Sequence, residues 1–114
     1  MHIFWLLLAV PSAAPKITSA YNTSSTSISV NWTPIADNFT NGILLSYKIK
    51  YIPFRRRILP AVITTNASAA SAELKGLKKF VHYLIIVNGY TKSGDGPETE
   101  VKCRTGEDGK DCPN

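Results

Sequence analysis

The stretch LKGLKKFVHYLIIVNGYTKSGDGP, residues 74–97, decides the fold because a strand pattern lies between fixed signals on both sides. Leu77 precedes Tyr83 by six residues, and apolar side chains then alternate along residues 83–87. A glycine-rich turn at residues 94–97 ends the segment. Alternation with a period of two indicates a β-strand, and Gly and Pro after it indicate a turn. The segment therefore predicts a β-sheet protein, and it contains no pattern typical of a catalytic site.

Regular alternation of apolar and polar residues marks further strands. In Ser27–Thr33 the apolar residues share one face, so Trp32 should point into the core. No segment shows a 3.6-residue period, so we expect no helix. The expected strands are Lys16–Tyr21, Ser27–Thr33, Ser46–Ile52, Ala61–Thr65, Ser71–Leu74, Tyr83–Tyr90 and Thr99–Thr105. Seven short strands separated by turn residues predict an all-β fold, an antiparallel two-sheet sandwich of the immunoglobulin-like kind.

Residues 15–108 resemble a fibronectin type III domain. The matching features are Ala14-Pro15 at the start, Trp32 followed by Pro34, Asn41-Gly42 before Tyr47–Tyr51, Leu74, the Leu77 to Tyr83 spacing, and Gly94-Asp-Gly-Pro97 before the last strand. The resemblance implies the strand connections of that family. Tyr83 can then lay its ring on the core while its hydroxyl bonds to backbone near Leu77. An immunoglobulin domain would instead carry a cysteine where this chain has Ile85.

The chain of 114 residues has room for one domain, which we place at residues 15–108. Residues 1–14 form a hydrophobic leader and residues 109–114 a C-terminal tail. The apolar run Ile3–Val10 is too short to span a bilayer. Small residues follow this run, as in a signal peptide, but no Lys or Arg precedes it. The leader is therefore either a signal peptide or a linker between domains.

Basic residues cluster in two connections, and the formal net charge is +5. In the topology that the resemblance implies, these connections share one pole of the sandwich. The cations are Arg55, Arg56, Arg57, Lys75, Lys78 and Lys79. Converging cations can bind a polyanion such as heparan sulfate, with affinity that falls as salt rises. The alternative is that they are solvated loop charges without a ligand.

A second candidate surface follows from the alternation in the strand Tyr83–Tyr90. If its odd-numbered residues face inward, an apolar row faces outward beside basic residues of neighbouring strands. The row is Leu84, Ile86 and Tyr90, and its basic neighbours are Lys48, Lys50, Lys102 and Arg104. Such a stripe is typical of a protein interface. The alternative is that the aliphatic stems of the basic residues cover it without any partner.

Four of the seven asparagines begin an Asn-X-Ser/Thr sequon, which indicates the secretory route. They are Asn22, Asn31, Asn38 and Asn66. Asn38 and Asn66 fall in expected loops and are the better candidates for N-glycosylation, whereas Asn31 lies within an expected strand.

The two cysteines leave two interpretations open. Alternation points Cys103 into the core, where a small free thiol packs well. A disulfide to Cys112 would close a short loop at the end of the chain, and it is sterically possible only if the last strand frays there.

Catalytic constellations are missing from the sequence. No Ser, Cys or carboxylate is placed by a motif to act with His2 or His82, and no phosphate-binding loop or metal-ligand spacing occurs. We therefore expect a non-enzymatic protein without a cofactor. The expected function is extracellular protein binding or cell adhesion within a multidomain cell-surface or matrix protein, with other proteins as partners and no nucleic acid. The alternatives are a structural spacer without a ligand and a module that binds heparan sulfate.

Overall fold

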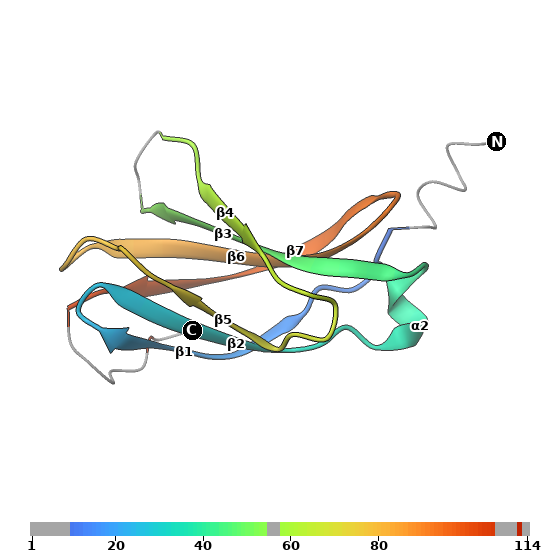
Figure 1. The fold of residues 1–114 in the computed structure, drawn as a ribbon, viewed down its shortest axis with the longest axis horizontal. Helices are drawn as coiled ribbons and strands as arrows, with labels where there is room; N and C mark the ends of the chain where they lie inside the picture. Colours follow the sequence, from blue (N-terminus) through green and yellow to red (C-terminus); the bar gives the residue numbers. More distant parts are fainter. Residues whose placement is uncertain (1–9, 55–57, 107–111, 113–114) are drawn as a thin grey trace.

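The computed structural model describes residues 10–54, 58–106 and 112, which form two antiparallel sheets packed face to face (Figure 1). The three-stranded sheet has the order β1-β2-β5 and consists of β1 (Lys16–Ser24), β2 (Ser27–Thr33) and β5 (Ser71–Leu74). The four-stranded sheet has the order β4-β3-β6-β7 and consists of β3 (Leu44–Pro53), β4 (Ala61–Thr64), β6 (His82–Thr91) and β7 (Gly94–Arg104). All neighbouring strands run antiparallel. The expected seven-stranded sandwich is confirmed.

One core lies between the two sheets, built from the inward rows of their strands. Trp32 of β2 is 2% exposed and Tyr47 of β3 is fully buried, and their ring centroids lie 5.4 Å apart. The Tyr47 hydroxyl accepts a hydrogen bond of 2.9 Å from the Ile35 amide, which satisfies a buried polar group. The period-two pattern in the sequence thus corresponds to the two faces of each strand.

Strand β7 begins earlier than the sequence predicts. Residues 92–96 read as a turn, yet Gly94 already pairs with Thr91, so only two residues lie between the strands. Gly94 has a φ of 140°, which suits glycine in so tight a hairpin. Because β7 lies at the sheet edge, Pro97 can belong to it although proline has no N–H to donate.

A short helix that the sequence does not predict, α2 (Asp37–Thr40), connects β2 and β3. Asn41 ends it with a φ of 55°, a conformation that asparagine tolerates better than most residues. A helix of four residues is too short to show a 3.6-residue period, which explains the difference.

Residues 10–14, which precede the domain expected at residues 15–108, also pack against the sandwich. Pro11 is fully buried, and a Cβ on Gly96 would lie 2.6 Å from the Pro11 Cβ, so only glycine allows this contact. The Ser12 amide donates a hydrogen bond of 2.8 Å to the Phe39 carbonyl. These contacts attach the segment to the end of the sandwich that carries α2 and the β6–β7 hairpin (Figure 1).

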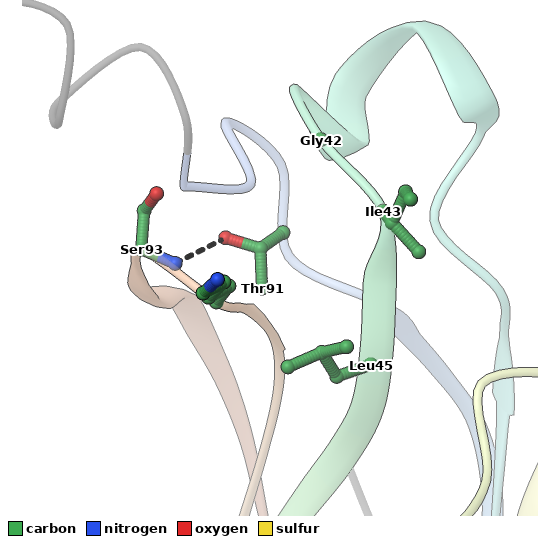
Figure 2. Close-up of a pocket in the computed structure, with 6 residues that line it drawn as sticks. Gly42, Ile43, Leu45, Thr91 and Ser93 are labelled. Atoms are coloured by element: carbon green, nitrogen blue, oxygen red, sulfur yellow. Dashed lines mark hydrogen bonds between the residues drawn. The ribbon is translucent and has the colours of Figure 1, made fainter.

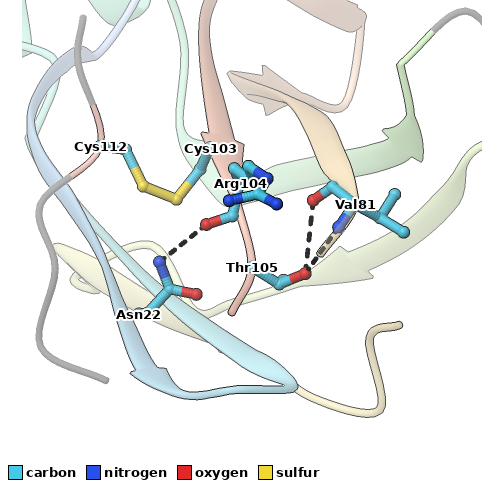
Figure 3. Close-up of a disulfide and its surroundings, with 6 residues drawn as sticks. All are labelled: Asn22, Val81, Cys103, Arg104, Thr105 and Cys112. Atoms are coloured by element: carbon cyan, nitrogen blue, oxygen red, sulfur yellow. Dashed lines mark hydrogen bonds between the residues drawn. A yellow bond between two sulfur atoms is a disulfide. The ribbon is translucent and has the colours of Figure 1, made fainter. Parts of the chain in front are cut away.

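A disulfide joins Cys103 of β7 to Cys112, with the two Cα atoms 4.9 Å apart (Figure 3). Strand β7 stays intact through Arg104, so the bridge requires no fraying, contrary to the sequence-based expectation. The Cys112 amide donates a hydrogen bond of 2.8 Å to the Ala20 carbonyl of β1. The tail residue therefore returns to the side of β1 and reaches Cys103 from there. The bridge and this bond link the free edges of the two sheets.

Candidate binding surface

Tyr83 fixes the loop between β5 and β6. Its side chain is buried, and its hydroxyl accepts a hydrogen bond of 2.9 Å from the Lys78 amide. Leu77 is buried in the core, and its amide donates a bond of 2.9 Å to the Thr26 carbonyl of the β1–β2 turn. Thr105 adds a bond from its hydroxyl to the Lys78 carbonyl at 2.5 Å. These contacts hold the β5–β6 loop to the sandwich.

The four-stranded sheet presents one face away from the core, which we call the outer face. Leu84, Ile86 and Tyr90 lie on it in one row along β6 and are half-buried. The register places Leu84 opposite Lys102 of β7, and Ile86 opposite Lys50 of β3. On β7, Ile86 lies opposite Glu100, so the row is bordered by lysines of both neighbouring strands and by one acid.

Toward the β6–β7 hairpin, the cations of the outer face are paired. Lys48 Nζ lies 2.8 Å from Asp95 Oδ1, and Lys50 Nζ lies 3.0 Å from Glu98 Oε2. Lys48 Nζ also lies 4.6 Å from the centroid of the Tyr90 ring. We call these five residues the ion-paired half. The two acids neutralise the charge of the lysines locally.

At the opposite end of β6, the cations face aromatic rings instead. Lys102 Nζ lies 3.9 Å from the ring centroid of Phe54, and the Arg104 guanidinium lies 5.5 Å from that of Phe80. Neither cation forms an ion pair with a carboxylate among the residues that the structure describes. We call these four residues the cation–aromatic half. Sequence reasoning missed the two phenylalanines because nothing in the sequence shows which rings the basic side chains of β7 reach.

The predicted basic pole is described only in part. Arg55, Arg56 and Arg57 lie outside the described residues. Lys75 Nζ lies 3.5 Å from Glu73 Oε1, and both side chains are well exposed, so this pair contributes little to stability. Lys78 and Lys79 are exposed on the β5–β6 loop, between the core residue Leu77 and the exposed Phe80. They therefore lie next to the cation–aromatic half.

The four sequon asparagines differ in their surroundings. Asn22 is 1% exposed, and its Nδ2 donates a hydrogen bond of 2.9 Å to the Arg104 carbonyl (Figure 3). In the folded domain the side chain of Asn22 is thus buried and bonded to β7. Asn31 is half-buried and donates to Ser19 Oγ at 2.9 Å. Asn38 and Asn66 are exposed.

A shallow, open pocket of about 240 Å³ lies at the hairpin end of the sandwich (Figure 2). Its apolar wall is formed by Ile43, which is 84% exposed, and Leu45. Its other residues are Gly42, Thr91, Lys92 and Ser93. In residues 10–54, 58–106 and 112, no group of His, Cys, Asp and Glu side chains could hold a metal ion. Within the same residues, no helix is long and apolar enough to cross a membrane.

Comparisons with known proteins agree with this architecture. The sequence is 40% identical over 98 residues to human Protein sidekick-1, which covers 82% of this chain and 4% of that protein. It is 35% identical over 101 residues to the human cell adhesion molecule DSCAM, covering 87% of this chain and 5% of that protein. The third fibronectin III domain of the human KIAA0343 protein superposes with a TM-score of 0.78 at 27% identity, over 90% of this chain and 88% of that one.

The chain spans only 4–5% of the length of these curated relatives, so the similarity concerns one module within each of them. The sequence profile of the fibronectin type III domain matches residues 13–102, nearly the whole folded body. Such a module is not itself catalytic. With its two-sheet sandwich and its buried Tyr83, which bonds to the β5–β6 loop, this chain belongs to the fibronectin type III family.

Proposed function

We propose that this domain is a protein-binding module of an extracellular cell-surface protein, and that the outer face of the four-stranded sheet makes the contact. The observation that carries the proposal is the row Leu84, Ile86 and Tyr90, which remains half-exposed on a sheet face that no other described element covers. Apolar and aromatic side chains flanked by charges are typical of the centre and rim of an interface. The relatives support the same role, because one of them is named as a cell adhesion molecule.

The rigid backbone of a sheet suits recognition. Because neighbouring strands fix each side chain, little conformational entropy is lost when a partner docks. Burial of Leu84 and Ile86 would contribute roughly 25 cal/mol for each Å² of apolar surface removed from water. The surrounding ion pairs would then set orientation more than affinity.

The test is binding of an Fc-fused domain to a panel of cell lines, measured by flow cytometry. We expect Leu84→Thr combined with Ile86→Thr to lower binding at least about tenfold, because each truncation at the centre of an interface costs about 1 kcal/mol or more. Threonine is β-branched, and strands favour such residues, so the fold should persist.

The matched control is Ile58→Thr combined with Leu59→Thr. It removes the same two residue types at positions that are 55% and 92% exposed, in the connection between β3 and β4 and not in the strand that carries the row. We expect this control to bind like the wild type. Equal binding by both variants would show that the outer face does not make the contact. A wild-type domain that binds no cell line would favour the alternative of a structural spacer.

A further inference from the structure

The charges on the outer face are distributed unevenly. Asp95 and Glu98 neutralise the lysines of the ion-paired half, whereas Lys102 and Arg104 have no carboxylate partner among the described residues. The exposed Lys78 and Lys79 lie on the adjoining loop. That loop is held to the end of β7 by Thr105, whose hydroxyl bonds to both Lys78 and Val81 (Figure 3 shows the bonds to Val81). Four cations thus lie at one end of the sheet, against one neighbouring acid of the same face, Glu100, and they produce a net positive potential there.

Phe80 stands out within this group. It is 63% exposed and has a φ of 56°, a left-handed conformation that costs a residue with a bulky side chain roughly 1–2 kcal/mol. Its exposed ring gains little from burial, so packing alone does not offset that cost. The ring lies against Arg104 and against Gly106, where a Cβ would come within 2.8 Å of Phe80 Cδ1. A strained and exposed aromatic residue of this kind points to a functional role.

From these observations we infer that the cation–aromatic half, together with Lys78 and Lys79, binds sulfated glycosaminoglycan. A guanidinium offers two parallel N–H donors to one sulfate group, and lysines add point charges along the chain. The exposed Phe80 ring offers an apolar face against which the C–H groups of a sugar ring can pack. At this end of the sheet, Lys78, Lys79, Lys102 and Arg104 all have exposed side chains. An open surface with spaced cations suits a long, linear polyanion.

The experiment compares two charge variants by titration calorimetry with a heparin oligosaccharide. Lys102→Ser combined with Arg104→Ser removes two charges from the cation–aromatic half. Lys48→Ser combined with Lys50→Ser removes two charges from the ion-paired half of the same face, so the net charge is identical. We expect the first variant to lose at least about tenfold in affinity and the second less than about threefold, since charge contacts to a polyanion dominate its affinity. Equal losses of affinity in the two variants would overturn the inference. So would wild-type binding that is already lost before the salt concentration reaches about 0.15 M.

Phe80→Gly tests the ring separately. Glycine adopts a φ of 56° without strain, so the melting temperature should stay equal or rise while heparin affinity falls by about threefold or more. A fall in stability with unchanged affinity would show that the ring is structural and would overturn its role in binding. A polyglutamate peptide of equal charge that displaces heparin equally well would overturn the assignment to a saccharide.

This binding activity is independent of the proposed protein contact. The Leu84→Thr and Ile86→Thr variant should keep its heparin affinity, because Lys102 and Arg104 are unchanged in it. Heparinase treatment of the cells should leave any protein-mediated binding in place. The two proposals can therefore fail separately.

Discussion

The two halves of the outer face have the same strand pattern but different surroundings. In the ion-paired half, acids on the first residues of β7 reach the lysines of β3. In the cation–aromatic half, β7 itself contributes the cations, and they face Phe54 and Phe80. The difference shows that alternation decides which residues face outward, whereas the register between strands decides which charges are neutralised. A basic stripe in a sequence is therefore only an upper bound on the free positive charge of a surface.

The largest expected effect comes from the support beneath the cation–aromatic half. Cys112→Ser removes the disulfide to Cys103, which precedes Arg104 in the same strand. For a closed loop of this size we expect a loss of roughly 2–3 kcal/mol in the free energy of unfolding. Urea unfolding monitored by tryptophan fluorescence measures it. Addition of a reductant should destabilise the wild type by a similar amount and leave the variant unchanged; a wild type that is insensitive to reductant would contradict the bridge.

A smaller effect distinguishes a tyrosine of the core from one of the outer face. Tyr83→Phe leaves the Lys78 amide without its acceptor, so we expect a loss of roughly 1–2 kcal/mol in unfolding free energy. Tyr90→Phe is the matched control in the ion-paired half and should change stability by less than about 0.5 kcal/mol. Thermal unfolding of both variants checks the pair. Equal melting temperatures would mean that the hydrogen bond from the Lys78 amide to the Tyr83 hydroxyl does not hold the loop that carries Phe80.

Removing the acids should make the two halves alike. Asp95→Asn combined with Glu98→Gln breaks both ion pairs of the outer face. Because the pairs are partly exposed, the loss of each should lower the free energy of unfolding by less than about 1 kcal/mol. Lys48 and Lys50 then become free cations, so the salt concentration needed to elute the variant from a heparin column should rise. Elution at the wild-type salt concentration would show that neutralisation by these acids does not separate the two halves.

The smallest effect concerns glycans. Asn66 lies in the loop after β4, and Asn38 lies in α2, so neither belongs to the outer face. We expect Asn66→Gln to remove a glycan from protein secreted by mammalian cells without changing stability or heparin affinity. Intact mass before and after glycosidase treatment measures occupancy. Asn22→Gln should leave the glycan mass unchanged, and a loss of mass in that variant would contradict the burial of Asn22 in the secreted protein.

Most of the fold could be predicted because its physics is local to each strand. The alternation in β2, β3 and β6 identifies inward residues such as Trp32 and Val87. The spacing from Leu77 to Tyr83 identifies the tyrosine that bonds to the β5–β6 loop. How far the folded body extends along the chain is less predictable. Pro11 packs on Gly96, far along the chain, and no local pattern indicates so distant a contact.

The candidate surface could be predicted only in outline. The outward row and its basic neighbours follow from alternation, but the pairing of Lys48 with Asp95 depends on the two-residue hairpin and on a bulge between Asn88 and Tyr90. The left-handed conformation of Phe80 could not be expected either, since aromatic residues disfavour it. Surface chemistry thus depends on register and backbone strain, which a single sequence does not reveal.

The central claim is that the two halves of one sheet face differ in their capacity to bind a polyanion. Residue-resolved chemical-shift mapping by NMR, with a heparin oligosaccharide as the titrant, tests this claim most directly. The account predicts shifts that concentrate at Phe80, Lys102 and Arg104 and stay small at Lys48 and Lys50. Shifts of equal size in both halves, or larger shifts in the ion-paired half, would contradict it.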